Sequence, residues 1–325
     1  MNGQALQDEI KRNRLTLARL ITEVENDTPS GRAALEELYP LTGKAHIIGI
    51  TGAPGVGKSS LVNQLALAFR HHSPSEEKPA VAIIAIDPSS PFTGGAILGD
   101  RIRMRDLSGD PGIFIRSMAA RGAIGGLARS TAQVARLMDA AGYKVILIET
   151  VGAGQAEVEI ASLAHTTIVV DAPGLGDDIQ AIKAGILEIA DILVVNKADL
   201  PGVENTERAL QSMLLLANSG QYNNHQHWDI PIIRTIASHG DGALRVMETV
   251  QSHLSYLKTS GEWEKRERLR IRDEVEHLVI QAFIQHLQEN VPLADLNNAV
   301  ESLFQRETSP YQEVQKLLCK AGINT

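Results

Sequence analysis

Eight consecutive residues have the composition and spacing of a phosphate-binding loop. Residues 52–59 read G-A-P-G-V-G-K-S, the complete G-x-x-x-x-G-K-[ST] pattern that holds a nucleoside triphosphate together with Mg²⁺. Its glycines let backbone N–H groups approach the phosphates, and the helix that follows adds partial positive charge at its N-terminus. We expect Lys58 to contact the β- and γ-phosphates and the Ser59 hydroxyl to bind Mg²⁺. The residues predicted to surround the phosphates are Gly52, Ala53, Pro54, Gly55, Val56, Gly57, Lys58, Ser59 and Ser60.

A second motif would read the base of the nucleotide. The apolar run 192–195 leads straight into Asn196-Lys197-Ala198-Asp199, and N-K-x-D after a strand is the guanine-reading signature of GTPases. A carboxylate at Asp199 can accept hydrogen bonds from guanine N1–H and the exocyclic amine, whereas adenine would leave that carboxylate unpaired. We expect Lys197 to lie along the base plane and Asn196 to tie neighbouring loops together. Ordinary turns are the alternative for both motifs.

Carboxylates follow two further apolar runs and could serve a metal ion. The run 81–86 ends at Asp87, and the run 143–148 ends at Glu149. Carboxylates at the C-terminal ends of parallel strands face the ligand crevice of an open α/β sheet, and Mg²⁺ prefers oxygen ligands. We therefore predict that Asp87 and Glu149 hold Mg²⁺ or its waters, with Asp100 in a glycine-rich loop as a third candidate. The alternative is that these carboxylates only cap the turns after them.

The elements that must position these residues alternate along the chain. Apolar, strand-like runs are separated by segments of helical periodicity, which is the pattern of a doubly wound fold. We therefore predict an α/β fold of the P-loop NTPase class, with a mostly parallel sheet flanked by helices. The strand-like runs end at Thr51, Asp87, Glu149, Asp171 and Asn196.

Helical segments precede and follow this α/β region. Pro29 suits the first turn of a second helix near the N-terminus, and the first helix has one apolar face formed by Leu17, Leu20, Ile21 and Val24. After Gly261 the chain becomes a charged helix. We predict a helical extension over 1–45, a P-loop GTPase domain over 46–258 and a helical segment over 259–325.

The C-terminal helical segment carries an apolar stripe. The residues that share it are Val275, Leu278, Val279, Ala282, Phe283, His286 and Leu287. A stripe with this spacing must be covered by another surface. Either the chain's own core and tail helices cover it, or a second subunit does.

Composition narrows the class of protein. The chain has 325 residues, of which 43% are hydrophobic and 22% charged, as expected for a soluble globular protein with a large core. Its net charge of −8 argues against non-specific binding of nucleic acid. Cys319 is the single cysteine, so no disulfide can form within the chain. The absence of a long apolar stretch or secretory core predicts a cytoplasmic protein without a membrane partner.

Taken together, these segments resemble the MeaB/ArgK/MMAA-type GTPases, the chaperones of methylmalonyl-CoA mutase within the SIMIBI class of P-loop proteins. The resemblance covers most of the chain and depends on segments that are more specific than the two nucleotide motifs. These segments are D-P-S-S from Asp87, G-G-A-I-L-G-D-R-I-R-M from Gly94, E-T-V-G-A-G-Q from Glu149 and G-D-D-I-Q-A-I-K-A-G from Gly176.

The resemblance implies roles for single residues. Asp87, Asp100 and Glu149 match the family's Mg²⁺ and switch carboxylates. Residues 236–238 (Ile236, Ala237 and Ser238) stand where the family has a loop behind the base, so the Ala237 N–H could reach guanine O6. The residues assigned to catalysis are Lys58 on the phosphates, Gln155 orienting the attacking water, and Asp177 and Lys183 on a mobile loop near nucleotide or partner.

The resemblance also implies a function. It predicts a metallochaperone that binds and hydrolyses GTP with Mg²⁺, forms a homodimer through its C-terminal helices, and serves a cobalamin-dependent acyl-CoA mutase of the methylmalonyl-CoA mutase type. The protein would gate cobalamin loading and removal in that mutase and protect it. One alternative is a small-molecule kinase or transport-linked ATPase, which requires a second substrate pocket and tolerance of ATP. Another is a nickel- or zinc-delivery GTPase, a class that typically has clusters of Cys or His.

Overall fold

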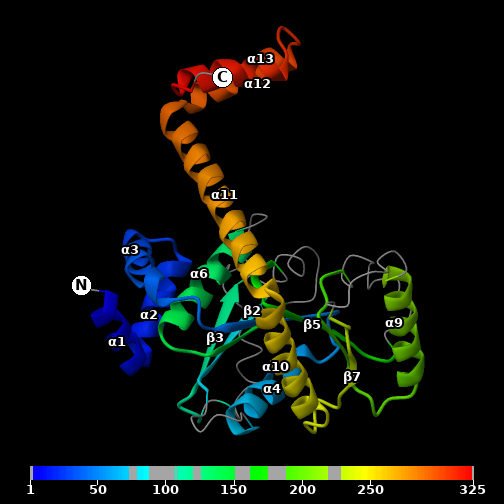
Figure 1. The fold of residues 1–325 in the computed structure, drawn as a ribbon. Coiled ribbons are helices and arrows are strands. Elements are labelled where there is room, and N and C mark those ends of the chain that lie inside the picture. The colour runs from blue at the N-terminus through cyan, green and yellow to red at the C-terminus, as the bar shows by residue number, and fades with distance from the viewer. Residues whose placement is uncertain are drawn as a thin grey trace. The chain divides into compact units, whose positions relative to one another are not determined.

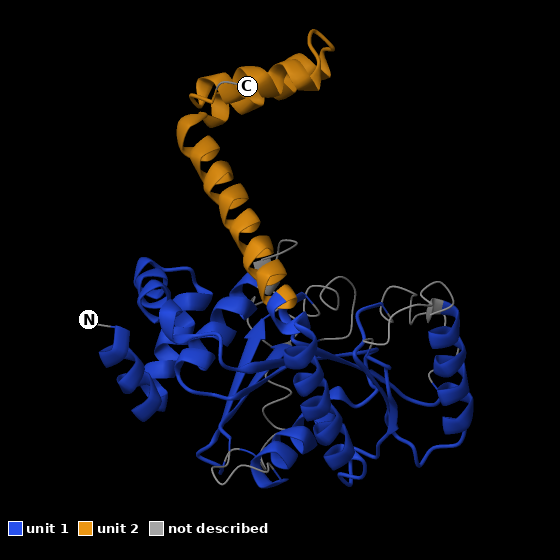
Figure 2. Ribbon diagram, in the orientation of Figure 1, with its two compact units in different colours: residues 1–264 blue, residues 265–325 orange. Residues whose placement is uncertain are grey.

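The computed structural model divides the chain into two compact units, Met1–Glu264 and Lys265–Thr325 (Figure 2). Each is described by itself below. The described residues are 3–72, 79–87, 107, 109–119, 126–150, 162–174, 188–218 and 228–323.

A parallel β-sheet forms the centre of the first unit. Within the described residues it has seven strands in the order β3-β2-β4-β1-β5-β6-β7, and every pairing between neighbours is parallel. This confirms the predicted α/β fold. The strands are β1 (His46–Thr51), β2 (Val81–Asp87), β3 (Ile113–Ala119), β4 (Val145–Glu149), β5 (Thr166–Asp171), β6 (Ile192–Val195) and β7 (Ile232–Arg234).

Helices cover both faces of this sheet, which explains why its strands are continuous apolar runs (Figure 1). Ile48 and Ile50 point into a core shared with α4 and α10, whereas Ile47 points into a core shared with α2 and α6. The helices of this unit are α1 (Gly3–Arg12), α2 (Arg14–Glu25), α3 (Pro29–Leu38), α4 (Lys58–His72), α6 (Gly126–Ala140), α9 (Val203–Asn218), α10 (Ala243–Ser260) and the first turn of α11 (Glu262–Asn290).

The order of the strands places a ligand crevice beside β1. The chain builds β2, β3 and β4 on one side of β1 and then β5, β6 and β7 on the other. Such a reversal opens a crevice outside the carboxyl ends of the strands, which is where open α/β sheets bind ligands. The phosphate loop follows β1 directly, so it lies at this point.

The predicted apolar face and the helix that begins at Pro29 both form. Asn13, however, divides the predicted first helix into α1 and α2, so Pro29 begins the third helix rather than the second. Leu17, Ile21 and Val24 of α2 are buried, and Leu20 is half-buried. The Thr28 hydroxyl accepts a hydrogen bond from Gly31 N at 3.1 Å and caps α3, whose first residue is proline. The Thr28 cap and the proline at the first position both favour the start of α3 at this point.

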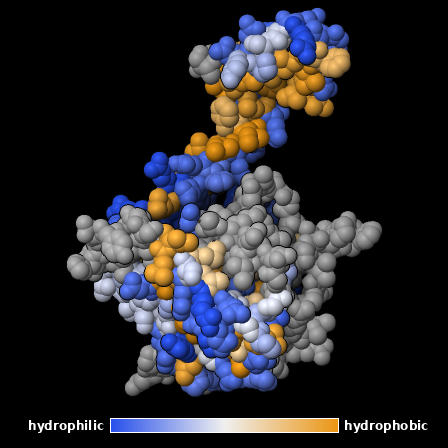
Figure 3. Space-filling view, turned by 90° about the vertical axis from the view of Figure 1, so that its right-hand side faces the viewer, coloured by the Kyte–Doolittle hydropathy of each residue, from blue (hydrophilic) through white to orange (hydrophobic). Residues whose placement is uncertain are grey.

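The second unit consists of the rest of α11 with α12 (Leu293–Phe304) and α13 (Pro310–Lys320). Ser309 and Gln312 form a capping box that starts α13. The ring Nε2 of His286 lies 3.0 Å from the Ala321 carbonyl oxygen and so connects α11 to the end of α13. Hydrophobic side chains gather on the surface of this unit (Figure 3).

The predicted apolar stripe on α11 is wider than its spacing suggested. Val275, Val279 and Phe283 are 53%, 62% and 43% exposed, and Ile280 and Ile284 are exposed as well. At about 100° per residue, Ile280 and Ile284 extend the apolar arc to roughly two thirds of the circumference between positions 275 and 287. A helix of this kind requires cover on more than one side.

None of the described helices combines the length and apolarity that crossing a bilayer demands.

Candidate nucleotide-binding site

The phosphate loop connects β1 to α4 in a conformation that only glycine adopts readily. Gly52, Gly55 and Gly57 have φ angles of 141°, 81° and 96°. A Cβ atom at Gly52 would lie 2.1 Å from the carbonyl oxygen of Val170, the penultimate residue of β5. The loop therefore packs directly on the neighbouring strand, and this close approach fixes where its N–H groups point.

Lys58 is the first residue of α4 and is almost completely buried. Its Nζ donates hydrogen bonds to the carbonyl oxygens of Gly52 at 2.8 Å and Ala53 at 3.0 Å. The ammonium group is thus held within the loop itself, next to the helix N-terminus where anions bind.

Ser59 and Glu149 bring two oxygen donors together beside the phosphate loop. The Ser59 hydroxyl donates to Glu149 Oε1 at 2.6 Å, and Glu149 is 4% exposed at the end of β4. Mg²⁺ takes a hydroxyl and carboxylate oxygens readily, so this pair fits the ion. Asp87 ends β2, the strand next to β4, but its side chain lies outside the described part of the chain.

Asn196 connects the phosphate loop to the base loops. Its Nδ2 donates to the Val56 carbonyl oxygen at 2.8 Å, and its Oδ1 accepts from the Thr235 hydroxyl and the Ala237 N–H, both at 3.0 Å. The side chain is almost fully buried. In this arrangement the Ala237 N–H bonds to Asn196, so a contact with guanine O6 requires that bond to rearrange.

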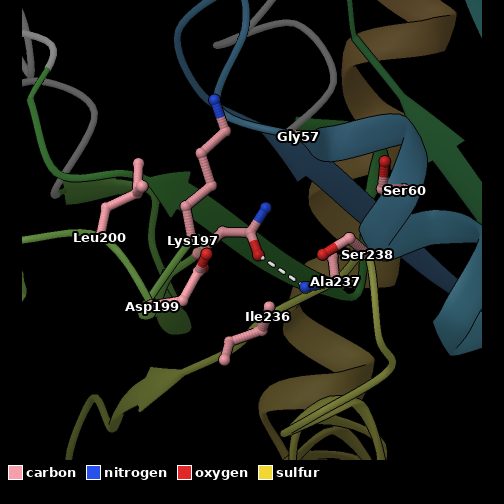
Figure 4. A pocket seen from close by; sticks show the side chains of 9 residues that line it. Gly57, Ser60, Lys197, Asp199, Leu200, Ile236, Ala237 and Ser238 are labelled. Carbon is pink, nitrogen blue, oxygen red and sulfur yellow. Dashed lines mark hydrogen bonds between the residues drawn. The ribbon is translucent and has the colours of Figure 1, made fainter.

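A pocket of about 180 Å³ lies where these loops meet (Figure 4). Asp199 comes from the loop after β6 and Ser238 from the loop after β7, on opposite sides of the pocket (Figure 4). Lys197 has a positive φ of 54°, an uncommon conformation for this residue type. The lining residues are Gly57, Ser60, Asn196, Lys197, Asp199, Leu200, Ile236, Ala237 and Ser238.

The structure thus brings together residues predicted from three separate motifs. Two lining or supporting residues are absent from the sequence predictions, namely Leu200 and Thr235. Thr235 could have been predicted from the sequence, because it directly precedes residues 236–238, the predicted loop behind the base. Four predicted residues lie outside the described part of the chain, namely Asp100, Gln155, Asp177 and Lys183.

Asp171 is a further carboxyl group at this edge of the sheet. It ends β5, its backbone oxygen accepts from Asn196 N at 2.7 Å, and its Oδ1 accepts from Ala172 N at 2.8 Å. Burial raises the pKa of Asp171, and the Ala172 hydrogen bond opposes that rise. Its backbone helps to position Asn196.

Comparison with known proteins finds GTPases among the relatives of this chain. Residues 17–292 match the family described as methylmalonyl Co-A mutase-associated GTPase MeaB. A putative GTPase of Pyrococcus abyssi is 42% identical over 308 residues, which are 95% of this chain and 93% of that protein. The mouse protein called methylmalonic aciduria type A homolog, mitochondrial, is 29% identical over 309 residues, covering 88% and 72% of the two chains.

A solved structure has the same fold. The crystal structure of LAO/AO transport system kinase has a TM-score of 0.72 and covers 97% of this chain and 96% of its own, at 23% identity. At that identity the likeness concerns the fold alone. The family match, by contrast, spans residues 17–292 and so takes in both nucleotide motifs of this chain, and the archaeal relative is similar over 95% of it. The chain is therefore a P-loop GTPase and belongs to the MeaB family of methylmalonyl Co-A mutase-associated GTPases.

Proposed function

We propose that this GTPase gates the loading and removal of the cobalamin cofactor in a partner acyl-CoA mutase of the methylmalonyl-CoA mutase type, and protects that mutase. The observation that carries the proposal is the Asn196 connection between the phosphate loop and the base pocket, because it couples recognition of guanine to the phosphates. The family description, which names association with the mutase, supports the choice of partner.

The chain's own residues account for most of the chemistry of GTP hydrolysis. Hydrolysis requires in-line attack of water on the γ-phosphorus while the charge of the transferred group is stabilised. Lys58 and the N–H groups of the phosphate loop would stabilise that charge, and Gln155 would orient the water. Mg²⁺, held through Ser59 and Glu149 with Asp87 and Asp100 as further candidates, would neutralise charge on the β- and γ-phosphates.

The change of shape that the mutase detects would come from loops that contact the γ-phosphate of GTP. Contacts to the γ-phosphate order switch segments, and hydrolysis releases them. Asp177 and Lys183 belong to a segment that we assign to this response or to partner contact. The difference between the GTP and GDP states would then reach the mutase as a change in the docking surface.

We further propose that residues 259–325 form a homodimer interface. The support is the wide apolar arc of α11, together with exposed apolar residues such as Leu293 and Phe304 on α12 and Val314 on α13. A second copy offers the same surface and covers it symmetrically. We place the protein in the cytoplasm, and its net charge of −8 gives no support for a nucleic-acid partner.

The decisive experiment measures transfer of cobalamin cofactor into the purified apo-mutase from the same genome. We expect the rate or extent of loading to differ between GTP, GDP and a non-hydrolysable GTP analogue when the full chain is present. The Asp199→Asn variant, which is impaired in guanine recognition, should lose this dependence. Loading that is identical in all three nucleotide states would contradict the proposal.

A further inference from the structure

Three buried histidines gather at the end of the sheet opposite the nucleotide site. His46 begins β1, His165 directly precedes β5, and His253 extends from α10. These residues are 5%, 2% and 0% exposed. The phosphate loop and Asn196 follow the C-terminal ends of their strands, whereas His46 and His165 lie at N-terminal ends. The cluster therefore has no part in binding nucleotide.

Thr166 and Asp191 connect two of these histidines into one chain of polar groups. The Thr166 hydroxyl oxygen lies 2.8 Å from His46 Nε2 and 2.8 Å from His253 Nδ1. On the other side of the His253 ring, Nε2 lies 3.3 Å from Asp191 Oδ1. Asp191 Oδ2 accepts from Thr167 N at 2.8 Å. We call His46, His165, Thr166, Asp191 and His253 the histidine cluster.

One arrangement of protons accounts for the two contacts of the Thr166 hydroxyl when the rings are neutral, although His253 Nε2 itself makes no hydrogen bond. The Asp191 carboxylate favours a proton on His253 Nε2, which leaves His253 Nδ1 to accept the hydroxyl proton of Thr166. The Thr166 oxygen then accepts from His46 Nε2–H. Although the order aspartate, histidine, hydroxyl is that of a hydrolase triad, Thr166 and His253 are fully buried and no substrate could reach them.

His165 is bonded to the backbone in a way that only its form with an unprotonated Nδ1 allows. The Ile47 N–H donates to His165 Nδ1 at 2.9 Å, so that nitrogen must be an acceptor. A proton on the same nitrogen would place two donors face to face. Uptake of a proton at His165 Nδ1 would therefore break the contact between this ring and β1.

Both tryptophans of the chain lie against this cluster. Trp263, in the first turn of α11, stacks on His165 with ring centroids 3.8 Å apart and an angle of 13° between the planes. Trp228 donates from Nε1 to the Asp191 carbonyl oxygen at 2.8 Å, and its ring centroid is 4.7 Å from that of His253. The start of α11 is thus attached to the sheet through the ring of His165.

The charges around His46 also oppose a proton there. Burial lowers the pKa of His46 well below its ordinary 6.5, and His165, His253 and Lys258 lower it further, while Asp191 raises it. Because the folded-state pKa is depressed, the unfolded chain binds more protons. The contribution of neutral His46 to the stability of the folded state is therefore complete above about pH 6.5, and it is lost as the pH falls below that value.

We propose that the histidine cluster is an acid-sensitive latch, which holds the first turn of α11 on the sheet at neutral pH and releases it when His165 and His46 take up protons. The parts of the latch are the Ile47–His165 hydrogen bond, the His165–Trp263 stack and the chain from His46 to Asp191. The nucleotide site is built from the opposite end of the same strands, so opening the latch leaves the phosphate loop and Asn196 in place.

Tryptophan emission tests the latch in the full-length protein. In a Trp228→Phe variant, Trp263 is the single tryptophan and reports directly on its stack with His165. Between pH 8 and pH 5 we expect the emission of Trp263 to shift to longer wavelength while far-UV circular dichroism and GDP binding stay constant. An emission maximum that is constant until the circular dichroism signal is lost would overturn the proposal.

A matched pair of substitutions identifies the group responsible. His165→Asn keeps an oxygen that can accept from Ile47 N–H but cannot take up a proton, so exchange of the amides in 259–266 should no longer rise at low pH. His72→Asn, the same change at an exposed position at the end of α4, should leave the rise unchanged.

If His165→Asn does not fold, amide exchange in the unmodified protein tests the latch instead. After correction for intrinsic rates, faster exchange of 259–266 at pH 5 than at pH 7 supports the latch, and equal exchange overturns it.

Discussion

A methyl group added at Gly57 would stand 2.3 Å from the side-chain nitrogen of Asn196. The same amide group donates to the carbonyl oxygen of Val56 at 2.8 Å. The last glycine of the phosphate loop and the asparagine of the base loop are therefore packed directly on each other. This packing and this hydrogen bond link the two halves of the nucleotide site.

Gly57→Ala should impair nucleotide binding more than a glycine substitution elsewhere in the same loop. The alanine must adopt a φ of 96° and displace Asn196, whereas Gly55→Ala meets only the strain of its own φ of 81°, with open space around it. That strain costs roughly 1–2 kcal/mol at either position. We expect the affinity for fluorescent GDP to fall at least about tenfold further in Gly57→Ala, since 1.4 kcal/mol is a factor of ten. Equal affinities in the two variants would contradict the packing argument.

Asp199→Asn should weaken guanine binding through its hydrogen bonds. The amide presents a donor to the two donors of guanine, so at least one polar group in the pocket stays unpaired, at about 1–3 kcal/mol. We expect GTP affinity to fall by a factor of roughly 10 to 100, and xanthine nucleotide, which has a carbonyl at C2, to gain. Asp241→Asn removes an exposed carboxylate outside the pocket and serves as the control. Isothermal titration with GTP and XTP measures both effects, and unchanged GTP affinity would refute the assignment.

Ser59→Ala should remove the effect of Mg²⁺ on nucleotide affinity. The substitution deletes the hydroxyl that lies 2.6 Å from Glu149 Oε1, and with it one of the oxygens offered to the ion. Ser59→Thr retains that oxygen and should restore the dependence. The measurement is GDP affinity with and without millimolar Mg²⁺. The assignment fails if the alanine variant still responds to Mg²⁺ like the unmodified protein.

The ion pair between Arg70 and Asp110 should stabilise the fold in a pH-dependent way. The Arg70 hydrogen bond lowers the pKa of Asp110 to about 2, and the two atoms that pair lie 2.7 Å apart. Because the folded-state pKa is below the unfolded value of 3.8, the stabilisation of about 2 kcal/mol is present above pH 4 and is lost as the pH falls toward 2. At pH 7, urea unfolding should give Asp110→Asn a free energy of unfolding about 2 kcal/mol lower than that of the unmodified protein.

The difference between Asp110→Asn and the unmodified protein should shrink as the pH falls from 4 toward 2. Glu276→Gln is the control, since its pair with Arg272 is largely exposed and exposed pairs contribute about 0–1 kcal/mol. A destabilisation by Asp110→Asn that is independent of pH would show that charge is not the cause.

Val279→Glu should separate a dimer into single chains. This residue lies near the middle of the apolar arc of α11 and is 62% exposed in one chain, so a carboxylate there would be buried unpaired between two copies. Gln288→Glu introduces the same charge on the polar side of the helix and should have no effect. Sedimentation equilibrium reports the mass of each variant. A monomeric unmodified protein would refute the proposed interface.

The strands and the two nucleotide motifs were predictable because their signals are local. A continuous apolar run such as 192–195 predicts a buried parallel strand from neighbouring residues alone. The glycine spacing of the phosphate loop reflects φ angles within eight residues. The hydrogen bonds of Asn196, by contrast, join it to residues distant in the sequence: Val56, Thr235 and Ala237. The motif predicted that Asn196 would tie loops together, but it did not predict these partners.

The histidine cluster had no signal in the sequence. His46 and Thr166 are 120 positions apart, and Thr166 and His253 are 87 positions apart. These residues meet because β1 and β5 are neighbours in the sheet and α10 packs across that face. The apolar arc of α11 was predicted in part. Ile280 and Ile284 are apolar in the sequence, but they fall outside the stripe with i, i+3, i+4 spacing, so the predicted arc was too narrow.

The sequence by itself determined the class of fold, the phosphate loop and the guanine motif, because each depends on residues that are close along the chain. The tertiary structure decided which distant groups share a site: Asn196 with Val56, Ser59 with Glu149, and His165 with Trp263. The physical reason is the order of the strands. Contacts across a parallel sheet depend on which strands become neighbours, and that choice is made by packing of the whole unit rather than by any one segment.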